Sequence, residues 1–411
     1  MIKAYARKQD CCGCTACKSI CPKQAIKMQP DDEGFLYPTI NGDLCMGCGM
    51  CNSVCPLQNE VNIQGHFLEP LVYALKHKSN DVRMSSSSGG AYTALSDSIM
   101  SRNTGKEYSL YGAEFYKEKE FVVRHKGTST VAGRDSFRGS KYVQSDLEDV
   151  FNEIKQDLLD GNTVLFTGTP CQTAGLSNYI QKTTVCLNIK NAMENLILND
   201  LICHGVQSPL LWKRYLDFIQ TKFKSKLQEY TFRLKEKGWH GYNVRAVFES
   251  GRYEINTDDI KAFVKLYSSK LALRPSCYTC QFANMDRPSD ISIGDFWGIE
   301  KSMPEMDDNK GVSLVLINSV KGEKIFEQMK DSICFKQSNM VDCSQHNLQQ
   351  PTQKPVERER FWQDFQIKGF DYVVKTYTGC GLIGKIKSLA IKILQSLGLL
   401  SIMKKVLSRY Q

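Results

Sequence analysis

Two cysteine runs with the same spacing lie near the N-terminus, and they restrict the fold of this chain more than any other feature. The first is Cys11-x2-Cys14-x2-Cys17-x3-Cys21-Pro22, and the second is Cys45-x2-Cys48-x2-Cys51-x3-Cys55-Pro56. Nine of the 17 cysteines fall in this stretch. A disulfide framework of this density is typical of small secreted chains. This chain has 411 residues and no apolar leader before its first cysteine, so we expect free thiolates in a reducing cytoplasm.

The spacing of the two runs is the signature of bacterial ferredoxins with two 4Fe–4S clusters, in which the fourth cysteine of each run binds the other cluster. The predicted ligands of one cluster are Cys11, Cys14, Cys17 and Cys55, and those of the other are Cys45, Cys48, Cys51 and Cys21. Cys12 is out of register and is left over. Zinc is the alternative, because paired C-x2-C motifs also bind it. Two complete runs ending in Cys-Pro favour iron–sulfur.

Composition divides the chain into four expected segments. They are a two-cluster ferredoxin domain at 1–60, a polar linker at 61–72, a mixed body at 73–350, and a polar connector with basic helices at 351–411. The stretch from Tyr372 to Gln411 holds seven Lys and Arg residues and no acid, and without them the net charge of +9 falls to +2. We therefore expect no nucleic-acid partner.

The basic tail repeats apolar residues at helical spacing, for example Ile383, Ile386, Leu389 and Ile393. Two interpretations fit this pattern. The helices pack on their own domain, or they attach to an anionic membrane surface. The second would place a cytoplasmic protein peripherally at the inner face of the membrane. No stretch approaches 18 apolar residues, so we expect no membrane-spanning helix.

The body mixes helical and strand patterns, so we predict an α/β (mixed α+β) fold behind the small dicluster ferredoxin domain. Residues 149–159 read as an amphipathic helix, and 163–167 and 196–202 as strands. Cys171 and Cys203 follow these two strands at a separation typical of one βαβ unit. Both would then lie at the carboxyl edge of the sheet.

A separate C-x2-C pair, Cys277 and Cys280, would complete a set of four thiolates with Cys171 and Cys203. This pattern suggests a third 4Fe–4S cluster. Two alternatives remain at this point. Cys171 and Cys203 could be inert buried thiols, and the C-x2-C pair could be half of a zinc site or a redox pair.

Several body segments resemble the coenzyme F420 hydrogenase/dehydrogenase beta-subunit family. The resembling segments, in the order of that family, are Ser85–Gly90, Gly139–Ser145, Phe166–Gln172, Asp200–Gly205, Cys277–Cys280 and Asp290–Gly298. The resemblance implies a flavoprotein that carries FAD and one additional 4Fe–4S cluster. Its best-known members pass electrons between iron–sulfur clusters and the deazaflavin F420, and others act on quite different substrates.

The expected flavin-binding residues are Ser87, Ser88, Gly89, Gly90, Lys141 and His204. Hydroxyls and glycine amides ahead of a helix at 91–100 suit a pyrophosphate, although an ordinary helix cap and tight turn have the same sequence. Lys141 could offset phosphate charge or be a plain surface lysine, and His204 could contact the flavin or simply pack in its loop.

Together these features predict an iron–sulfur flavoprotein oxidoreductase. Electrons would pass between a redox partner protein (a ferredoxin or an oxidoreductase subunit), the clusters, FAD and a deazaflavin-like or other substrate. The alternative is a non-catalytic subunit that connects a partner enzyme to ferredoxin.

Overall fold

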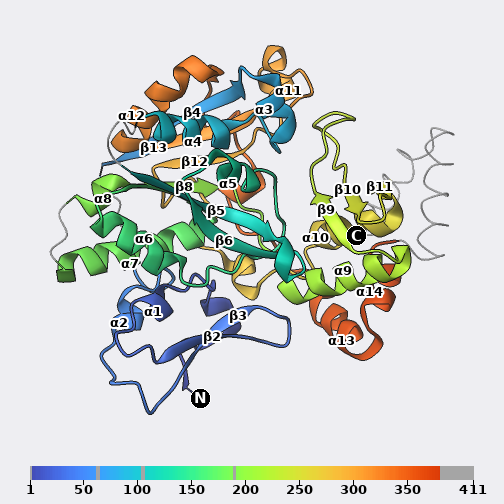
Figure 1. Cartoon of the computed structure of the whole chain (residues 1–411), viewed down its shortest axis with the longest axis horizontal. Coiled ribbons are helices and arrows are strands. Elements are labelled where there is room, and N and C mark those ends of the chain that lie inside the picture. The colour runs from blue at the N-terminus through green and yellow to red at the C-terminus, as the bar shows by residue number, and fades with distance from the viewer. Residues whose placement is uncertain (1, 62–64, 103–106, 188–190, 380–411) are drawn as a thin grey trace, which may run out of the picture. The chain divides into compact units, whose positions relative to one another are not determined.

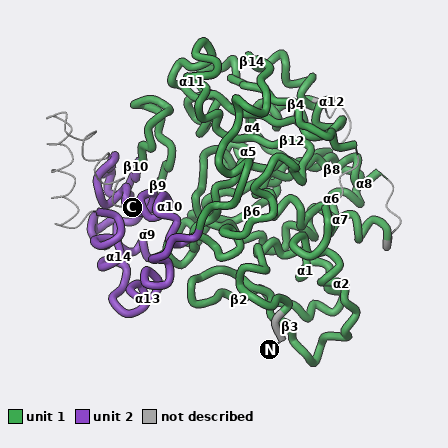
Figure 2. Tube along the Cα trace, turned by 180° about the vertical axis from the view of Figure 1, so that it is seen from behind, with its two compact units in different colours: residues 1–213, 230–244, 273–353 green, residues 214–229, 245–272, 354–411 purple. Residues whose placement is uncertain are grey.

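The computed structural model describes residues 2–61, 65–102, 107–187 and 191–379. These residues form two compact units, which Figure 2 colours separately. Unit 1 comprises Met1–Lys213, Tyr230–Val244 and Leu273–Gln353, and unit 2 comprises Arg214–Glu229, Arg245–Ala272 and Lys354–Gln411. The tail from residue 380, with both interpretations of its apolar stripes, lies outside the described residues. Among the described helices, none has the length and apolar character needed to cross a membrane.

The N-terminal part of unit 1 is a small antiparallel sheet of order β1-β3-β2 with two short helices (Figure 1). Its elements are β1 Ile2–Lys3, the 3-10 helix η1 Lys8–Asp10, α1 Ala16–Ser19, β2 Ile26–Pro30, β3 Leu36–Ile40 and α2 Met50–Ser53. Helices α1 and α2 occupy equivalent positions in the two cysteine runs, because each begins one residue before the third cysteine.

The body of unit 1 is built on an eight-stranded sheet of order β14-β4-β13-β12-β8-β7-β5-β6. The strands are β4 His66–His77, β5 Tyr108–Tyr116, β6 Val122–Thr128, β7 Thr163–Gly168, β8 Leu196–Leu201, β12 Ile291–Asp295, β13 Ser313–Ser319 and β14 Ile333–Gln337. The neighbours β5, β7, β8 and β12 run parallel, and the remaining pairs are antiparallel. The predicted mixed α/β class is confirmed. Strand β4 begins within the stretch that we expected to be a linker.

Helices cover both faces of this sheet, and β7 shows why. Val164 and Phe166 point into a core that includes α6 and α7, whereas Leu165 points into a second core with α4 and α12. Successive strand residues face opposite sides, so a strand buried on both sides is apolar throughout. The helices of the body are α3 Asn80–Ser85, α4 Ala91–Arg102, α5 Val131–Ser136, α6 Val150–Leu159, α7 Pro170–Leu187, α8 Ala192–Asn195, α11 Ile299–Ser302 and α12 Val320–Met329.

Short 3-10 helices connect several of these elements. They are η2 Lys117–Lys119, η3 Pro275–Thr279, η4 Pro304–Met306, η5 Lys330–Ser332 and η6 His346–Leu348. The expected helix at 149–159 and the expected strands at 163–167 and 196–202 correspond to α6, β7 and β8. The predicted βαβ unit is also present, since β7 and β8 are parallel neighbours and α7 lies between them in the sequence.

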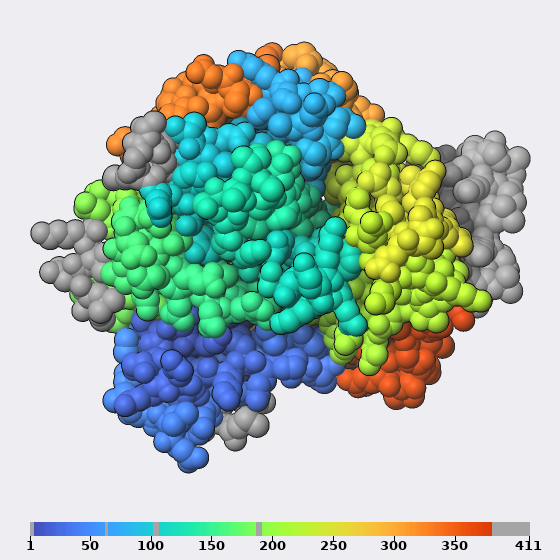
Figure 3. All heavy atoms as spheres, viewed as in Figure 1, coloured from blue at the N-terminus to red at the C-terminus, as the bar shows by residue number. Residues whose placement is uncertain are grey.

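The N-terminal residues share a hydrophobic core with the body. Ala16, Ile20 and Val54 are buried in the same cluster as Phe151 of α6 and Leu176 of α7. Figure 3 shows the N-terminal residues, in blue, lying against the green residues of the body on the face in view. The cysteine runs are therefore seated on α6 and α7, within one packed unit.

Within the described residues, unit 2 contains a three-stranded sheet of order β11-β10-β9 and four helices. They are α9 Pro209–Phe223, β9 Leu227–Thr231, β10 Arg245–Phe248, β11 Tyr253–Ile255, α10 Asp258–Ser268, α13 Arg358–Lys368 and α14 Phe370–Tyr377. Helix α9 begins in unit 1, and β9 ends there. Tyr215 packs against Phe263 and Phe370 and donates its hydroxyl to the carbonyl of Ile260, which holds α9, α10 and α14 together.

Gly89 offers a test of how the sheet and α4 are joined. A Cβ at Gly89 would lie 2.2 Å from the carbonyl oxygen of Leu75 and 2.5 Å from the amide nitrogen of Ser313. Both atoms are backbone atoms of paired strands and cannot yield. We expect Gly89→Ala to lower the free energy of unfolding by about 1–3 kcal/mol or more, the usual cost of overpacking.

Gly251 is the matched control, since a Cβ there meets nothing within 4 Å although φ is +80°. Gly251→Ala should cost only the left-handed backbone term, roughly 1–2 kcal/mol. Anaerobic thermal unfolding followed by circular dichroism compares the two. Equal losses in both variants would contradict the packing argument.

Candidate iron–sulfur centres

The two cysteine runs adopt the same backbone path. Gly13 and Gly47, each directly before the second cysteine of its run, have φ of +72° and +70°. Thr15 and Gly49, two residues further on, have φ of +65° and +72°. Left-handed residues at matching places turn each loop back on itself, so that its first three cysteines face one space.

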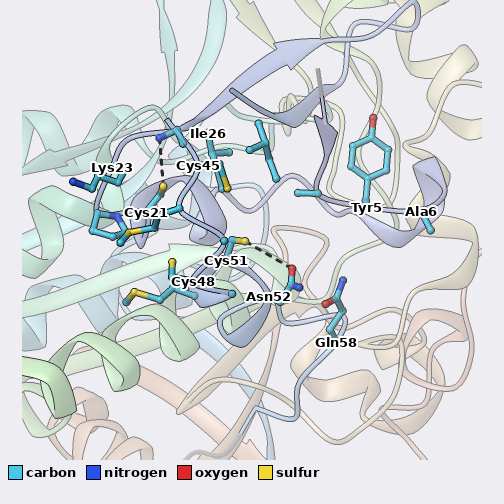
Figure 4. Close-up of a pocket in the computed structure, with 18 residues that line it drawn as sticks. Tyr5, Ala6, Cys21, Lys23, Ile26, Cys45, Cys48, Cys51, Asn52 and Gln58 are labelled. Carbon is cyan, nitrogen blue, oxygen red and sulfur yellow. Dashed lines mark hydrogen bonds between the residues drawn. The ribbon is translucent and has the colours of Figure 1, made fainter. Parts of the chain in front are cut away.

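The second run faces a cavity of about 540 Å³ (Figure 4). Cys45, Cys48 and Cys51 line it together with Cys21, the fourth cysteine of the first run. Cys45 and Cys48 are exposed to solvent. The amide N–H of Ala25 donates to Cys21 Sγ at 3.3 Å. All four predicted ligands of this cluster therefore line one common cavity.

The first run faces a smaller, more enclosed cavity of about 30 Å³. Its cysteines are Cys11, Cys12, Cys14 and Cys17 with Cys51 and Cys55 of the second run. Burial raises the pKa of the Cys17 thiol, and the neighbouring Cys11 and Cys55 thiols raise it further. In both cavities the fourth cysteine of one run joins three of the other, the arrangement that the ferredoxin signature requires.

The four predicted ligands of the third cluster, here called the four body cysteines, lie at the carboxyl edge of the sheet. Cys171 is the second residue of α7, shortly after β7, and Cys203 follows β8. Since β7 and β8 pair in parallel, with Gly168 opposite Asp200, their ends meet at one edge. Cys277 lies in η3 and Cys280 directly follows it.

The causes of the raised pKa values of these thiols indicate that the thiols are neighbours. Burial raises the pKa of Cys203 to about 12, and the nearby Cys171 and Cys280 add to the increase. The pKa of Cys277 is also raised, mainly by burial and to a smaller extent by the nearby Cys203, Cys280 and Cys171. The pKa of Cys280 rises to about 11 through burial and then Cys171. Protonated thiols bind metal only by releasing their protons.

Hydrogen-bond donors surround the same sulfurs. The amide of Gly205 donates to Cys203 Sγ at 3.4 Å, and Thr169 Oγ1 lies 3.3 Å from Cys171 Sγ. Backbone N–H groups of Val206 and of Phe282 and Ala283 donate to Cys277 and Cys280, respectively. Donors aimed at sulfur are typical of thiolate sites, where they stabilise negative charge.

The described His, Cys, Asp and Glu side chains contain no group of three arranged for a single metal ion. The four thiolates of a 4Fe–4S cluster bind separate irons and stand apart around the cluster, so a cluster site does not have the geometry of a single-ion site.

The spacing of the motif left Cys12 without a role. In the structure it is buried between other cysteines. Its side chain is 5% exposed and lies in the same packed cluster as Cys14 and Cys171, both of which affect its pKa. A Cβ at Gly175 of α7 would lie 2.6 Å from Cys14 Sγ, so the first run presses directly on α7. Cys12 therefore lies between the dicluster ligands and the body cysteines.

The expected flavin-binding residues are mostly engaged within the protein. Ser87 Oγ accepts from the amide of Ser140 at 2.7 Å, Ser88 Oγ donates to the carbonyl of Val312, and Gly89 N donates to Ser313 Oγ. Gly90 has φ of +95° and packs on His77, as in a tight turn before α4. The carbonyl of His204 accepts from Thr352 Oγ1 at 3.4 Å.

Lys141 is not the surface lysine of our second interpretation. Its ammonium group donates to the carbonyls of Ser136, Phe137 and Arg138, at the end of α5. Burial lowers its pKa to about 7. An ammonium group in this position stabilises the carboxyl end of the helix.

Arg274 is a site residue that the sequence analysis missed. It immediately precedes η3, and its guanidinium group lies against Cys11. The only sequence signal was its position three residues before Cys277, which does not distinguish it from any other arginine.

The ligand assignment of the first run predicts different results for two adjacent cysteines. Cys14→Ser should lower the iron content of the anaerobically reconstituted chain, because a predicted ligand is lost. Cys12→Ser should leave the iron content unchanged, since Cys12 neighbours ligands without being one of them. Iron and acid-labile sulfide analysis measures both variants. An equal loss of iron in the two variants would show that Cys12 is itself a ligand.

Two family models and a solved structure are similar to parts of this chain. Residues 161–342 match the family described as the C terminus of the coenzyme F420 hydrogenase/dehydrogenase beta subunit, and residues 10–59 match a 4Fe–4S dicluster domain. A chain of the F420-reducing NiFe hydrogenase complex from Methanosarcina barkeri is 16% identical, with a TM-score of 0.44, over 77% of this chain and 94% of that one. No curated protein matched the sequence. Residues 161–342 thus belong to the family formed by the C-terminal part of the beta subunits of coenzyme F420 hydrogenases and dehydrogenases, behind a 4Fe–4S dicluster domain at residues 10–59.

Proposed function

We propose that this chain is an iron–sulfur flavoprotein oxidoreductase that carries electrons between a redox partner protein and a substrate through three 4Fe–4S clusters and FAD. One observation supports the route best. Cys12 is buried in one packed cluster with Cys14, a predicted ligand of the dicluster domain, and Cys171, a predicted ligand of the body cluster. A buried thiol that neighbours both predicted ligand sets supports a short path for electrons between them.

The exposure of the cysteines suggests the order in which the clusters are connected to a partner protein and to the body. Cys45 and Cys48 are exposed, whereas Cys14 is 7% exposed and packs on α7. A protein partner would reach the cluster at Cys45 and Cys48, and the other dicluster site would face the body. The clusters supply one-electron transfer, and FAD would convert this to two-electron chemistry with the substrate.

The four body thiols support a cluster in preference to inert cysteines. Each has a neighbouring N–H or O–H group directed at its sulfur, and each lies near the others. Buried thiols of raised pKa gain nothing from one another in the absence of metal. Iron would compensate their burial by binding them as thiolates.

FAD enters the proposal through the family resemblance, and a deazaflavin such as F420 is the substrate that this family suggests. The polar groups of the Ser87–Gly90 turn already have partners within the protein. That observation favours a second candidate, a non-catalytic subunit that connects a partner enzyme to ferredoxin. Peripheral membrane contact through residues 380–411 remains a proposal beside both.

Anaerobic reconstitution of the full chain tests the proposal. The protein should hold about twelve irons, four per cluster, and should retain FAD. Cys203→Ser should lose about four irons and slow reduction of the flavin by dithionite-reduced ferredoxin, because the body cluster is removed. Cys334→Ser is the control, since Cys334 is an exposed thiol of β14 outside every predicted ligand set.

The results separate the two candidates. Full iron in Cys203→Ser would exclude the proposed body cluster. A wild-type chain with all of its iron and no flavin, even after FAD is added, would favour the connecting role over the oxidoreductase.

A further inference from the structure

Arg274 carries a buried positive charge beside one ligand loop of the dicluster domain. Its side chain is among the largest that are fully buried, with 1% of the residue exposed. Nε donates to the carbonyl of Cys11 at 2.8 Å, and Nη2 lies 3.6 Å from Cys11 Sγ. The guanidinium group also stands over the ring of Tyr37, 4.2 Å from its centroid.

The other acceptors of this guanidinium group are neutral. Nη2 donates to the carbonyl of Leu36 at 3.0 Å, and Nη1 donates to Gln144 Oε1 at 2.8 Å. Gln144 in turn donates Nε2 to the carbonyl of Cys12. Neutral acceptors leave the charge of Arg274 uncompensated by a carboxylate at contact distance, and burial keeps water from screening it.

The two cysteine loops differ in the space beside the residue that precedes the second cysteine. A Cβ at Gly13 would lie 2.8 Å from Arg274 Nη1, so glycine is needed there for the approach of the guanidinium group as well as for its φ of +72°. A Cβ at Gly47, the equivalent residue, would meet nothing within 4 Å. The loops share a backbone path and a ligand spacing, but among the described residues the cations beside them differ in burial. Arg274 is buried against the first loop, whereas Lys23, which lines the cavity of the second run, is exposed to solvent.

We propose that Arg274 raises the reduction potential of the cluster bound by the first cysteine run above that of its twin, and so draws electrons from the exposed end of the dicluster domain toward the body. The inference rests on the proposed function. Reduction adds one negative charge to a cluster, and a nearby cation or a hydrogen bond to a ligand sulfur stabilises the reduced form. The electron lost by the cluster near Cys45 and Cys48 is gained by the one near Cys11, and the redox partner protein replaces it.

Arg274 would also serve structure, because it joins the loop before Cys277 to the carbonyls of Cys11 and Leu36. A purely structural role predicts lost iron or lost stability when the residue is changed. It does not predict that one of two potentials moves while both clusters remain. The two potentials are therefore the quantity to measure.

The experiment uses the full chain, reconstituted anaerobically and titrated with EPR detection of each cluster. Iron is measured first in every variant. Arg274→Gln should lower one dicluster midpoint so that its one-electron reduction is about tenfold less favourable, which is 59 mV, and should leave the other in place. Arg274→Lys, which keeps the charge, should retain most of the wild-type value.

Arg7→Gln is the matched control. Arg7 is a cation four residues before Cys11, but its side chain is 70% exposed and paired with Asp10. Water screens such a charge, so neither midpoint should move. Gln144→Glu is a second, nearly isosteric test that places a carboxylate against Nη1 of Arg274 and should lower the same midpoint as Arg274→Gln.

Unchanged midpoints in Arg274→Gln with all iron retained would overturn the inference. If that variant fails to hold its clusters, Gln144→Glu decides, and an unchanged midpoint there overturns it equally. A wild-type chain that never binds iron would instead overturn the proposed function, an outcome that the iron analysis separates from the first.

Discussion

The packing of the first cysteine run on α6 and α7 is the interaction on which the arrangement of this protein depends. Ala16 and Ile20 are buried with Phe151 and Leu176 in one core. This contact sets the backbone of the dicluster domain against the start of α7, which contains Cys171 in its first turn. Burial of apolar surface supplies the free energy, and the positions of the sulfurs follow from it.

A second constraint is the cost of placing so many ionisable thiols in a protein interior. Burial and mutual repulsion raise the pKa values of Cys17, Cys203, Cys277 and Cys280, so each would be neutral without a metal. Amide donors near the sulfurs and the guanidinium group of Arg274 offset this cost by stabilising the thiolate form. These groups are arranged for negative charge on sulfur, which is the state that iron binding produces.

Glycine has two separate uses in this structure. At Gly47 the open surroundings leave the left-handed φ as the reason for the residue. At Gly89 the reason is contact, because the backbone atoms of β4 and β13 leave no room for a side chain. The Ser-Gly turn resembles a phosphate-binding turn in sequence, and in the structure it packs between a sheet and a helix. Both kinds of turn use the same residue types, and this is why sequence alone could not separate them.

By itself, the sequence determined the elements whose information is local. The cysteine spacing defined two ligand loops, the apolar periodicity located α6, β7 and β8, and the separation of Cys171 from Cys203 indicated a parallel pair. Only the tertiary structure decided that Cys12 neighbours Cys171, that Lys141 binds the end of α5, and that Arg274 lies on Cys11. The last of these contacts joins residues 263 positions apart. No local pattern encodes a contact of that kind, because it arises from the packing of whole elements against one another.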